Sequence, residues 1–437
     1  MNYSLPSKRC AGAGLARVRG VSLLCGALGL LASGCGDDGS PPSESAWTRP
    51  APPGILTATV DSRDTHPVVD GRDLTTLVSG NTALALDLFR ILREAAPSEN
   101  VALGPYSISQ AMSMLYAGAR GDTALAMRGG LHFDVEPARF HQTVNGLDLE
   151  LSSRNSDILL RNANQAWLQA GLSVNAEYLD VLMRDYGAPL ATLDFETDPE
   201  ISRAAINGWV QDVTERKIPE LFPRGAIDSN TILVLANAMY MDAPWKYQFD
   251  PERTAKLPFT LFDGASADVD TMHFDEFLPS ASGADWQAVE IPYRGDEVSM
   301  FVVVPDDLPR FEAGLTPERL DEVLGAVRDG GIHLSMPRFT FNFHSSLVEP
   351  LRELGLGVLF DAPDLSGIAD GGLTVAAVEH EAFIEVDEKG TRAAAATGVA
   401  IADSHGPTVA VDRPFLFFVV DKPTRSVLFL GRVLDPR

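Results

Sequence analysis

The residues that decide the fold are EVDEKGTRAAAATGVAIADSHGPTVAVDRP, residues 385–414 of the 437-residue chain. On their N-terminal side, residues 382–387 alternate between apolar and polar side chains, which predicts a strand. On their C-terminal side, residues 414–420 are almost all apolar and predict a buried strand. A long connection without an element of its own is unusual in a compact domain, so this one is expected to be either disordered or functional.

Residues 390–398 have two open interpretations. Alanine is the best helix former and Thr391 could cap a helix, so composition alone favours a helix. The other interpretation is a strand, because a period of two places Thr391, Ala393, Ala395 and Thr397 on one face, and all four side chains are small. Such a strand could slide between two existing strands while Arg392, on the opposite face, stays in solvent.

Two motifs in this part of the chain resemble those of a known family. The residues Glu388-Lys389-Gly390-Thr391, with the alanine run after them, resemble the hinge of the reactive-centre loop of serpins. Residues 409–417, closed by residues 431–433, resemble that family's C-terminal signature at nearly the family's separation. The resemblance implies an α+β fold, the serpin fold, with about nine helices, three β-sheets, a metastable central sheet and an exposed reactive-centre loop. It assigns to the hinge Gly390, Thr391, Ala393, Ala394, Ala395, Ala396 and Thr397.

The N-terminus has the pattern of a bacterial export signal. A basic front is followed by the apolar residues 21–31 and then by small residues before Cys35, which is typical of a lipobox. The prediction is a signal peptide over residues 1–34, a lipidated Cys35 with a flexible tether over residues 35–66, and a serpin domain over residues 67–437. An ordinary cleaved signal with a chance cysteine is the alternative. The expected location is the outer membrane or surface of a Gram-negative bacterium, with a lipid membrane as partner.

Composition excludes several classes of function. The three cysteines are Cys10, Cys25 and Cys35, so the mature domain has neither a disulfide framework nor a thiol nucleophile. No G-x-S-x-G or H-E-x-x-H motif is present, and the eight histidines are scattered, so the chain is expected to be no enzyme and to hold no metal or other cofactor. A net charge of −25 makes a nucleic-acid partner unfavourable. A monomer is expected.

The resemblance assigns two further groups of residues. Asn237 lies in the apolar run 231–241, which predicts a strand buried on both faces, and a buried amide needs a partner. On composition, Asn237 is an ordinary core amide, His380 an ordinary histidine, and Ser107 a helix cap; Gly104 stands where the family usually has another serine. The resemblance instead places in the shutter beneath the opening sheet Ser107, Asn237 and His380. It places in the breach, where the loop first enters the sheet, Trp245, Arg338 and Glu388, the last two as an ion pair.

The function that the resemblance implies is irreversible inhibition of a serine protease by a suicide-substrate mechanism, through a covalent complex. Counting forward from Glu388 by the family spacing places the reactive bond at Ser404-His405, whereas counting back from Pro414 places it at Asp403-Ser404. The first bond predicts an elastase- or subtilisin-like target that accepts small residues; the second requires a protease with an acidic preference. The alternative function is that of a non-inhibitory serpin, which acts as a binding, carrier or storage protein.

Overall fold

Three β-sheets and a set of helices make up the computed structural model, which describes residues 54–154, 157–274, 278–330, 332–391 and 408–437. The predicted α+β fold with three sheets is confirmed; the described residues contain ten α-helices, against about nine predicted. The helices are α1 (Gly71–Ala95), α2 (Pro105–Tyr116), α3 (Gly121–Gly130), α4 (Pro137–Ser152), α5 (Ala176–Val181), α6 (Pro199–Val213), α7 (Leu308–Ala313), α8 (Pro317–Ala326), α9 (Val348–Leu351) and α10 (Val358–Asp361). Short π or 3-10 turns are η1 (Leu182–Tyr186), η2 (Pro251–Arg253) and η3 (Arg352–Leu356).

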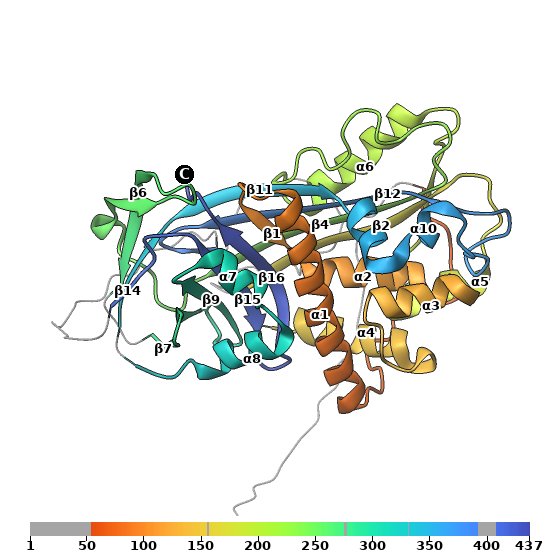
Figure 1. Cartoon of the computed structure of the whole chain (residues 1–437). Coiled ribbons are helices and arrows are strands. Elements are labelled where there is room, and N and C mark those ends of the chain that lie inside the picture. The colour runs from red at the N-terminus through yellow and green to blue at the C-terminus, as the bar shows by residue number, and fades with distance from the viewer. Residues whose placement is uncertain (1–53, 155–156, 275–277, 331, 392–407) are drawn as a thin grey trace, which may run out of the picture. The chain divides into compact units, whose positions relative to one another are not determined.

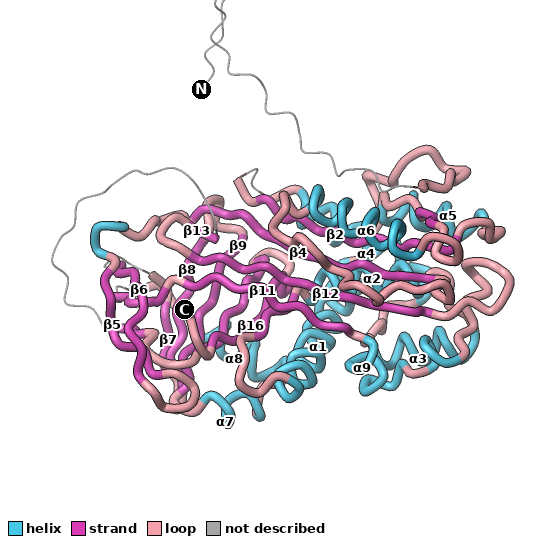
Figure 2. The backbone as a smooth tube through the Cα atoms, turned by 90° about the horizontal axis from the view of Figure 1, so that it is seen from above, coloured by secondary structure: helices cyan, strands magenta, loops and turns pink. Residues whose placement is uncertain are grey.

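The central sheet carries the candidate site. Its strands run in the order β11 (Phe339–Ser346), β12 (Val375–Val386), β4 (Leu233–Pro244), β2 (Leu159–Gln169) and β3 (Ala191–Leu193), and β13 (Gly390–Thr391) pairs with β4 off this path. Strands β12 and β4 are parallel neighbours, whereas β2 and β11 pair antiparallel to them (Figure 2). A parallel pair at the centre of the sheet explains why β4 and β12 are long and buried on both faces.

Strand β4 contacts a different hydrophobic core on each face. Leu235 and Met239 pack into the main core, which includes α2, whereas Ala236 and Ala238 pack into a second core that includes residues of α6. Helix α6 lies on one side of the sheet and α2 on the other (Figure 1). The apolar run that predicts a central strand therefore has the buried environment it requires on both sides.

The strands that follow the loop, β14 to β16, belong to the other two sheets. One has the order β1 (Val101–Leu103), β16 (Ser426–Val433), β15 (Phe415–Asp421), β9 (Val298–Pro305), β8 (Trp286–Pro292) and β7 (Ser280–Ser282); the other has the order β14 (Thr408–Ala410), β10 (His333–Pro337), β6 (Ser266–Phe274) and β5 (Ala255–Thr260). The segment after β12 thus connects all three sheets. The long connection between the two predicted strands contains two short elements, β13 and β14.

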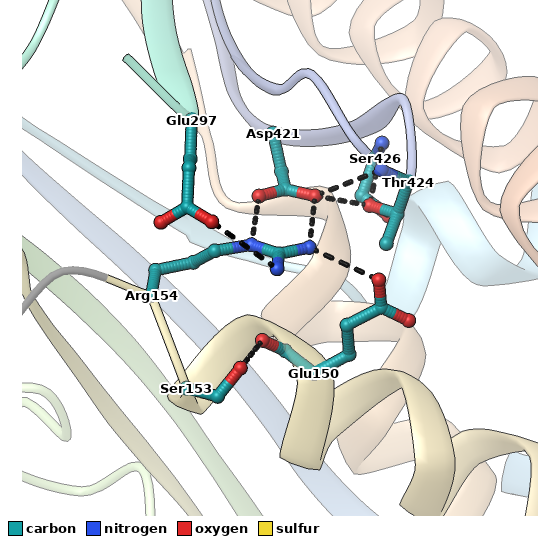
Figure 3. A network of polar contacts seen from close by, with 7 residues as sticks. All are labelled: Glu150, Ser153, Arg154, Glu297, Asp421, Thr424 and Ser426. Carbon is teal, nitrogen blue, oxygen red and sulfur yellow. Dashed lines mark hydrogen bonds and ion pairs between the residues drawn. The ribbon is translucent and has the colours of Figure 1, made fainter. Parts of the chain in front are cut away.

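A buried ion pair fixes the end of α4 to the β15–β16 hairpin (Figure 3). The Arg154 guanidinium donates to both carboxylate oxygens of Asp421, at 2.6 and 3.0 Å, and the Asp421 side chain is fully buried. The Thr424 hydroxyl donates to the same carboxylate at 2.6 Å. The hydrogen bond of Arg154 with Asp421 raises the pKa of the Arg154 guanidinium. Removing one partner of such a buried pair costs about 3–5 kcal/mol, because the other charge is left uncompensated.

The N-terminal boundary of the folded part differs from the prediction. Residues 54–66 were predicted to belong to a flexible tether, yet they hydrogen-bond to the central sheet and to neighbouring helices: Thr192 N–H donates to the Gly54 carbonyl at 2.8 Å, and the Asp64 N–H to that of Arg184 at 2.9 Å. The folded part therefore begins before residue 67. The predicted signal peptide and Cys35 lie outside the described residues. Among the described residues, no helix is long and apolar enough to cross a membrane.

Candidate functional site

The candidate site is the end of the central sheet at which β4 and β12 stop pairing. Within the described residues, their parallel pairing runs as far as Phe383 opposite Tyr240. Strand β12 continues to Val386 alongside β11 alone, and the chain then turns back. The turn places β13 antiparallel to β4, with Thr391 opposite Ala243. A strand that continued from β13 would run antiparallel to both β4 and β12.

Hinge residues Gly390 and Thr391 already belong to this sheet. A Cβ atom at Gly390 would lie 2.2 Å from the Ala243 carbonyl oxygen, so only glycine allows the close approach of the two backbones. The Thr391 side chain is 1% exposed, and its hydroxyl lies 2.6 Å from the Tyr293 hydroxyl. Of the two interpretations of residues 390–398, a strand describes these first two; residues 392–407 lie outside the described residues.

The residues predicted for the breach surround the turn at residues 387–389. The Trp245 indole stacks on the Tyr293 ring at 4.5 Å between centroids. Its Nε1–H donates to the Asp387 carbonyl at 2.9 Å, and its backbone N–H donates to the Lys389 carbonyl at 2.9 Å. Burial of Asp387 raises the pKa of its carboxyl, although the backbone N–H groups of Lys389 and Gly390 partly oppose this shift. Trp245 therefore fixes the start of the loop through the backbone.

The predicted ion pair of Arg338 with Glu388 is a long contact. Arg338 Nη1 lies 3.9 Å from Glu388 Oε1, whereas its Nη2 lies 2.7 Å from Asp270, a partner that the sequence analysis did not find. Arg338, and next Lys256, lower the pKa of Asp270. The buried Glu388 instead accepts a hydrogen bond of 2.6 Å from the Thr254 hydroxyl. Asp270 lies in β6, which pairs with β10, and the sequence contains no local signal for this contact.

The three residues predicted for the shutter are in contact. The His380 side chain hydrogen-bonds to Asn237 across the β12–β4 pair, and Asn237 Nδ2 donates to the Ser107 hydroxyl at 2.6 Å. All three are fully buried. Ser107 lies inside α2 and is not its cap; the cap position belongs to Gly104. A buried polar group left without its partner costs about 1–3 kcal/mol, so the His380–Asn237 contact opposes separation of β4 from β12, whereas the Asn237–Ser107 contact holds β4 to α2.

The hydrogen bonds of His380 define its protonation state. The Gly104 N–H donates to His380 Nε2 at 3.3 Å, so this nitrogen carries no proton. The neutral ring then carries its proton on Nδ1 and donates to the Asn237 side-chain oxygen. Burial, and next the neighbouring His344, lower the pKa of His380 to about 3, which agrees with a neutral ring.

Gly104, where the resemblance expects a serine, has a local explanation. A Cβ atom at this position would lie 2.6 Å from Met239 Sδ, so the methionine side chain occupies the space that a larger residue 104 would need. The Gly104 backbone still serves the shutter through its hydrogen bond to His380. Glycine in place of serine therefore removes a side chain from the shutter but keeps the backbone hydrogen bond to His380.

The shutter contains three residues that the sequence analysis missed: Gln110, Asn162 and Asn164. Asn162 and Asn164 both donate to Gln110 Oε1, at 2.6 and 3.0 Å. Their side-chain oxygens lie within hydrogen-bond distance of the Ser107 hydroxyl. A signal was present in the sequence, because residues 159–168 alternate as a strand does and place the two asparagines, at i and i+2, on one face with apolar residues.

These features define a class of protein, one in which the chain leaves a central strand, turns back and begins to pair with the neighbouring strand. Residues 79–436 match the family model described as Serpin (serine protease inhibitor). The chain belongs to the serpin family.

Named relatives and solved structures agree with this assignment. The chain is 36% identical over 378 residues to the leukocyte elastase inhibitor of Sus scrofa, covering 82% of this chain and 99% of the relative. It is 32% identical over 372 residues to an uncharacterized serpin-like protein of Methanosarcina mazei, covering 82% and 87%. Among solved structures, uncleaved ovalbumin has a TM-score of 0.76 at 25% identity, with 83% of this chain and all of ovalbumin covered. Human thyroxine-binding globulin has a TM-score of 0.78 at 26% identity, with 83% and 99% covered.

Proposed function

We propose that this serpin is an irreversible inhibitor of serine proteases that traps its target by inserting the cleaved loop into the central sheet. The observation that carries the proposal is β13, because Gly390 and Thr391 already pair with Pro244 and Ala243 of β4. Further residues of the loop, added in the same direction, would form a strand between β4 and β12. The inhibitor is consumed in the reaction and does not turn over.

The chemical step uses the protease's own nucleophile. The protease's general base takes the proton of its serine hydroxyl as the serine oxygen attacks the Ser404 carbonyl carbon. The Ser404-His405 bond breaks, and the protonated base passes that proton to the leaving amine of His405. An ester now joins Ser404 to the protease. Water would normally hydrolyse this ester, so trapping requires loop insertion to displace and distort the protease first.

Small side chains keep the barrier to insertion low. Thr391 already occupies a buried position beside Tyr293. In a strand, Ala393, Ala395 and Thr397 share the face of Thr391, and none of them introduces a charge or a bulky group into the core. The new strand would replace the β4–β12 backbone hydrogen bonds with two sets of antiparallel ones, and this gain drives the reaction.

The small side chain of Ser404, directly before the proposed reactive bond, favours an elastase- or subtilisin-like target. Ser404 is preceded by Ile401, Ala402 and Asp403, and relatives that share about a third of the sequence are named as leukocyte elastase inhibitors. If cleavage occurs instead at Asp403-Ser404, the target has an acidic preference.

We further propose that Cys35 is acylated and holds the protein at the membrane as a lipoprotein, so that it meets proteases at the cell surface. Metabolic labelling with a palmitate analogue tests this. The full chain is expected to be labelled and a Cys35→Ala variant unlabelled; an unlabelled full chain would contradict acylation.

A non-inhibitory carrier is the second candidate, because the fold is also similar to that of human thyroxine-binding globulin. The decisive experiment incubates the domain from residue 51 onward with elastase- and subtilisin-like proteases, followed by denaturing gel electrophoresis and intact mass. Inhibition predicts a boiling-resistant adduct and release of a peptide that begins at His405, or at Ser404 for the alternative bond. Cleavage without adduct across the panel would favour the carrier.

A further inference from the structure

The N-terminal strap, residues 54–66, covers the edge of the central sheet and precedes residue 79, where the family match begins. Ile55 forms a bridge with Ala191 of the edge strand β3. The Leu56 N–H donates to the Leu190 carbonyl at 2.8 Å. Further along, the Thr59 N–H donates to Asp180 at 2.7 Å. The strap backbone therefore hydrogen-bonds to the backbone of the sheet edge and to the Asp180 side chain of α5.

Arg63 of the strap reaches helix α4. Its Nε–H donates to Asn145 Oδ1 at 2.7 Å, and its Nη2 forms an ion pair with Asp148 Oδ2 at 2.6 Å. Asn145 Nδ2 donates in return to the Asp64 carbonyl at 2.8 Å. The side chains of Arg63 and Asp148 are only 21% and 16% exposed, so their interaction is stronger than that of a surface pair.

Asp148 continues the chain of hydrogen bonds into the shutter. Its other oxygen accepts a hydrogen bond of 2.8 Å from Gln110 Nε2 and one from the Tyr106 hydroxyl. Gln110 Oε1 accepts from Asn162 and Asn164, which contact Ser107. A continuous path of polar contacts thus runs from the strap to the residues that join β4 to β12.

The direction of this path depends on Asp148. An ionised carboxylate only accepts hydrogen bonds, so the amide of Gln110 must direct its NH₂ group to Asp148 and its oxygen to the two asparagines. If the Gln110 amide were reversed, its NH₂ group would face the NH₂ groups of Asn162 and Asn164, and these hydrogen bonds would be lost. The site is buried, so the loss would be costly. The ion pair with Arg63 holds the Asp148 carboxylate in place, and thereby fixes the orientation of the network.

We propose that Arg63 is a positioning residue for loop insertion. Through Asp148 and Gln110 it stabilises the closed shutter, and so it sets how readily β4 and β12 separate. The contact of His380 with Asn237 crosses this strand pair and must break when a strand enters. The inference rests on the proposed function, because it concerns the insertion step that the function requires.

The test measures insertion without a protease. The full chain is incubated with a synthetic peptide of the sequence of residues 391–404, and uptake is followed by native mass spectrometry. Arg63→Ala is expected to take up the peptide about tenfold faster, whereas Arg63→Lys, which keeps the charge, stays near the unmodified rate. The matched control is Arg139→Ala, since Arg139 pairs with Asp73 at 2.6 Å at a more exposed site outside this network.

A second variant separates positioning from general destabilisation. Asp148→Asn has nearly the same shape but gives Gln110 a partner that can also donate, so it is expected to accelerate uptake as well. A purely structural role would lower the thermal midpoint of Arg63→Ala without raising uptake above the Arg139→Ala rate, and that result would overturn the inference. Absence of uptake by the unmodified chain would contradict the proposed function and this inference with it. If the unmodified chain takes up peptide and forms the protease adduct while all variants match it, only the inference fails.

Discussion

Replacing Thr391 by arginine tests the hinge most sharply. The Thr391 side chain is 1% exposed and its hydroxyl lies 2.6 Å from that of Tyr293. An arginine there would bury a charge with no counter-ion, and such a group typically costs about 3–5 kcal/mol. The arginine is therefore expected to leave the sheet in the uncleaved chain and to meet this cost on insertion; at 1.4 kcal/mol per factor of ten, the insertion step becomes about 10²- to 4 × 10³-fold slower. Hydrolysis of the acyl-enzyme would then win, and the inhibitor would become a substrate.

The assay compares the fraction of loop cleavage that ends in a boiling-resistant adduct, at equal protease concentration. Thr391→Val is a control of similar size; it leaves the Tyr293 hydroxyl without a partner, at about 1–3 kcal/mol, and is expected to reduce trapping modestly. The double variant Thr391→Val/Tyr293→Phe removes both hydroxyls and is expected to recover most of that loss. A Thr391→Arg variant that still traps its protease as efficiently as the unmodified chain would refute the assignment of the hinge.

Three further predictions concern the breach and the shutter. Glu388→Lys breaks the hydrogen bond from Thr254 and places a cation near Arg338, so polymers are expected to form faster on warming; an unchanged rate on native gels would refute a role for Glu388 in closing the breach. Gly104→Ser collides with Met239 and is expected to cost about 1–3 kcal/mol by overpacking, measured as a lower thermal midpoint, whereas an unchanged midpoint would show that the site has room. The pKa of His380 is about 3 in the folded protein and about 6.5 when unfolded, so the unfolded state binds the proton first as pH falls. Stability is therefore expected to fall below about pH 6.5, by up to about 1.4 kcal/mol per pH unit from this residue, and His380→Gln is expected to lose that component; equal pH dependence of the two midpoints would contradict it.

The sequence predicts those parts of the fold that depend on local patterns. Of the alternating residues 382–387, all but the last form the end of β12, and the apolar run of residues 231–241 lies mostly within β4. A pattern of this kind determines which face of a strand is buried, because side chains alternate with a period of two. It cannot determine the partner strand, so the pairing of Gly390 and Thr391 with β4 required the three-dimensional structure.

The site residues that the sequence analysis missed lie far away in the chain. Asp270 is the short-range partner of Arg338 because β6 pairs with β10, and this register depends on tertiary packing. Arg63 contacts Asp148 through a segment that composition describes as a tether. This segment is rich in polar and small residues and carries no apolar pattern that would predict a folded element. Its backbone contacts therefore cannot be predicted from composition.

The most direct test of the central claim measures backbone hydrogen exchange of residues 391–404 after the loop is cleaved. If the cleaved loop becomes a strand between β4 and β12, its N–H groups donate alternately to the two strands, and their exchange is expected to slow to the rate of β4 itself. Amides of residues 391–404 that exchange as fast as those of an unstructured peptide of the same sequence would contradict loop insertion.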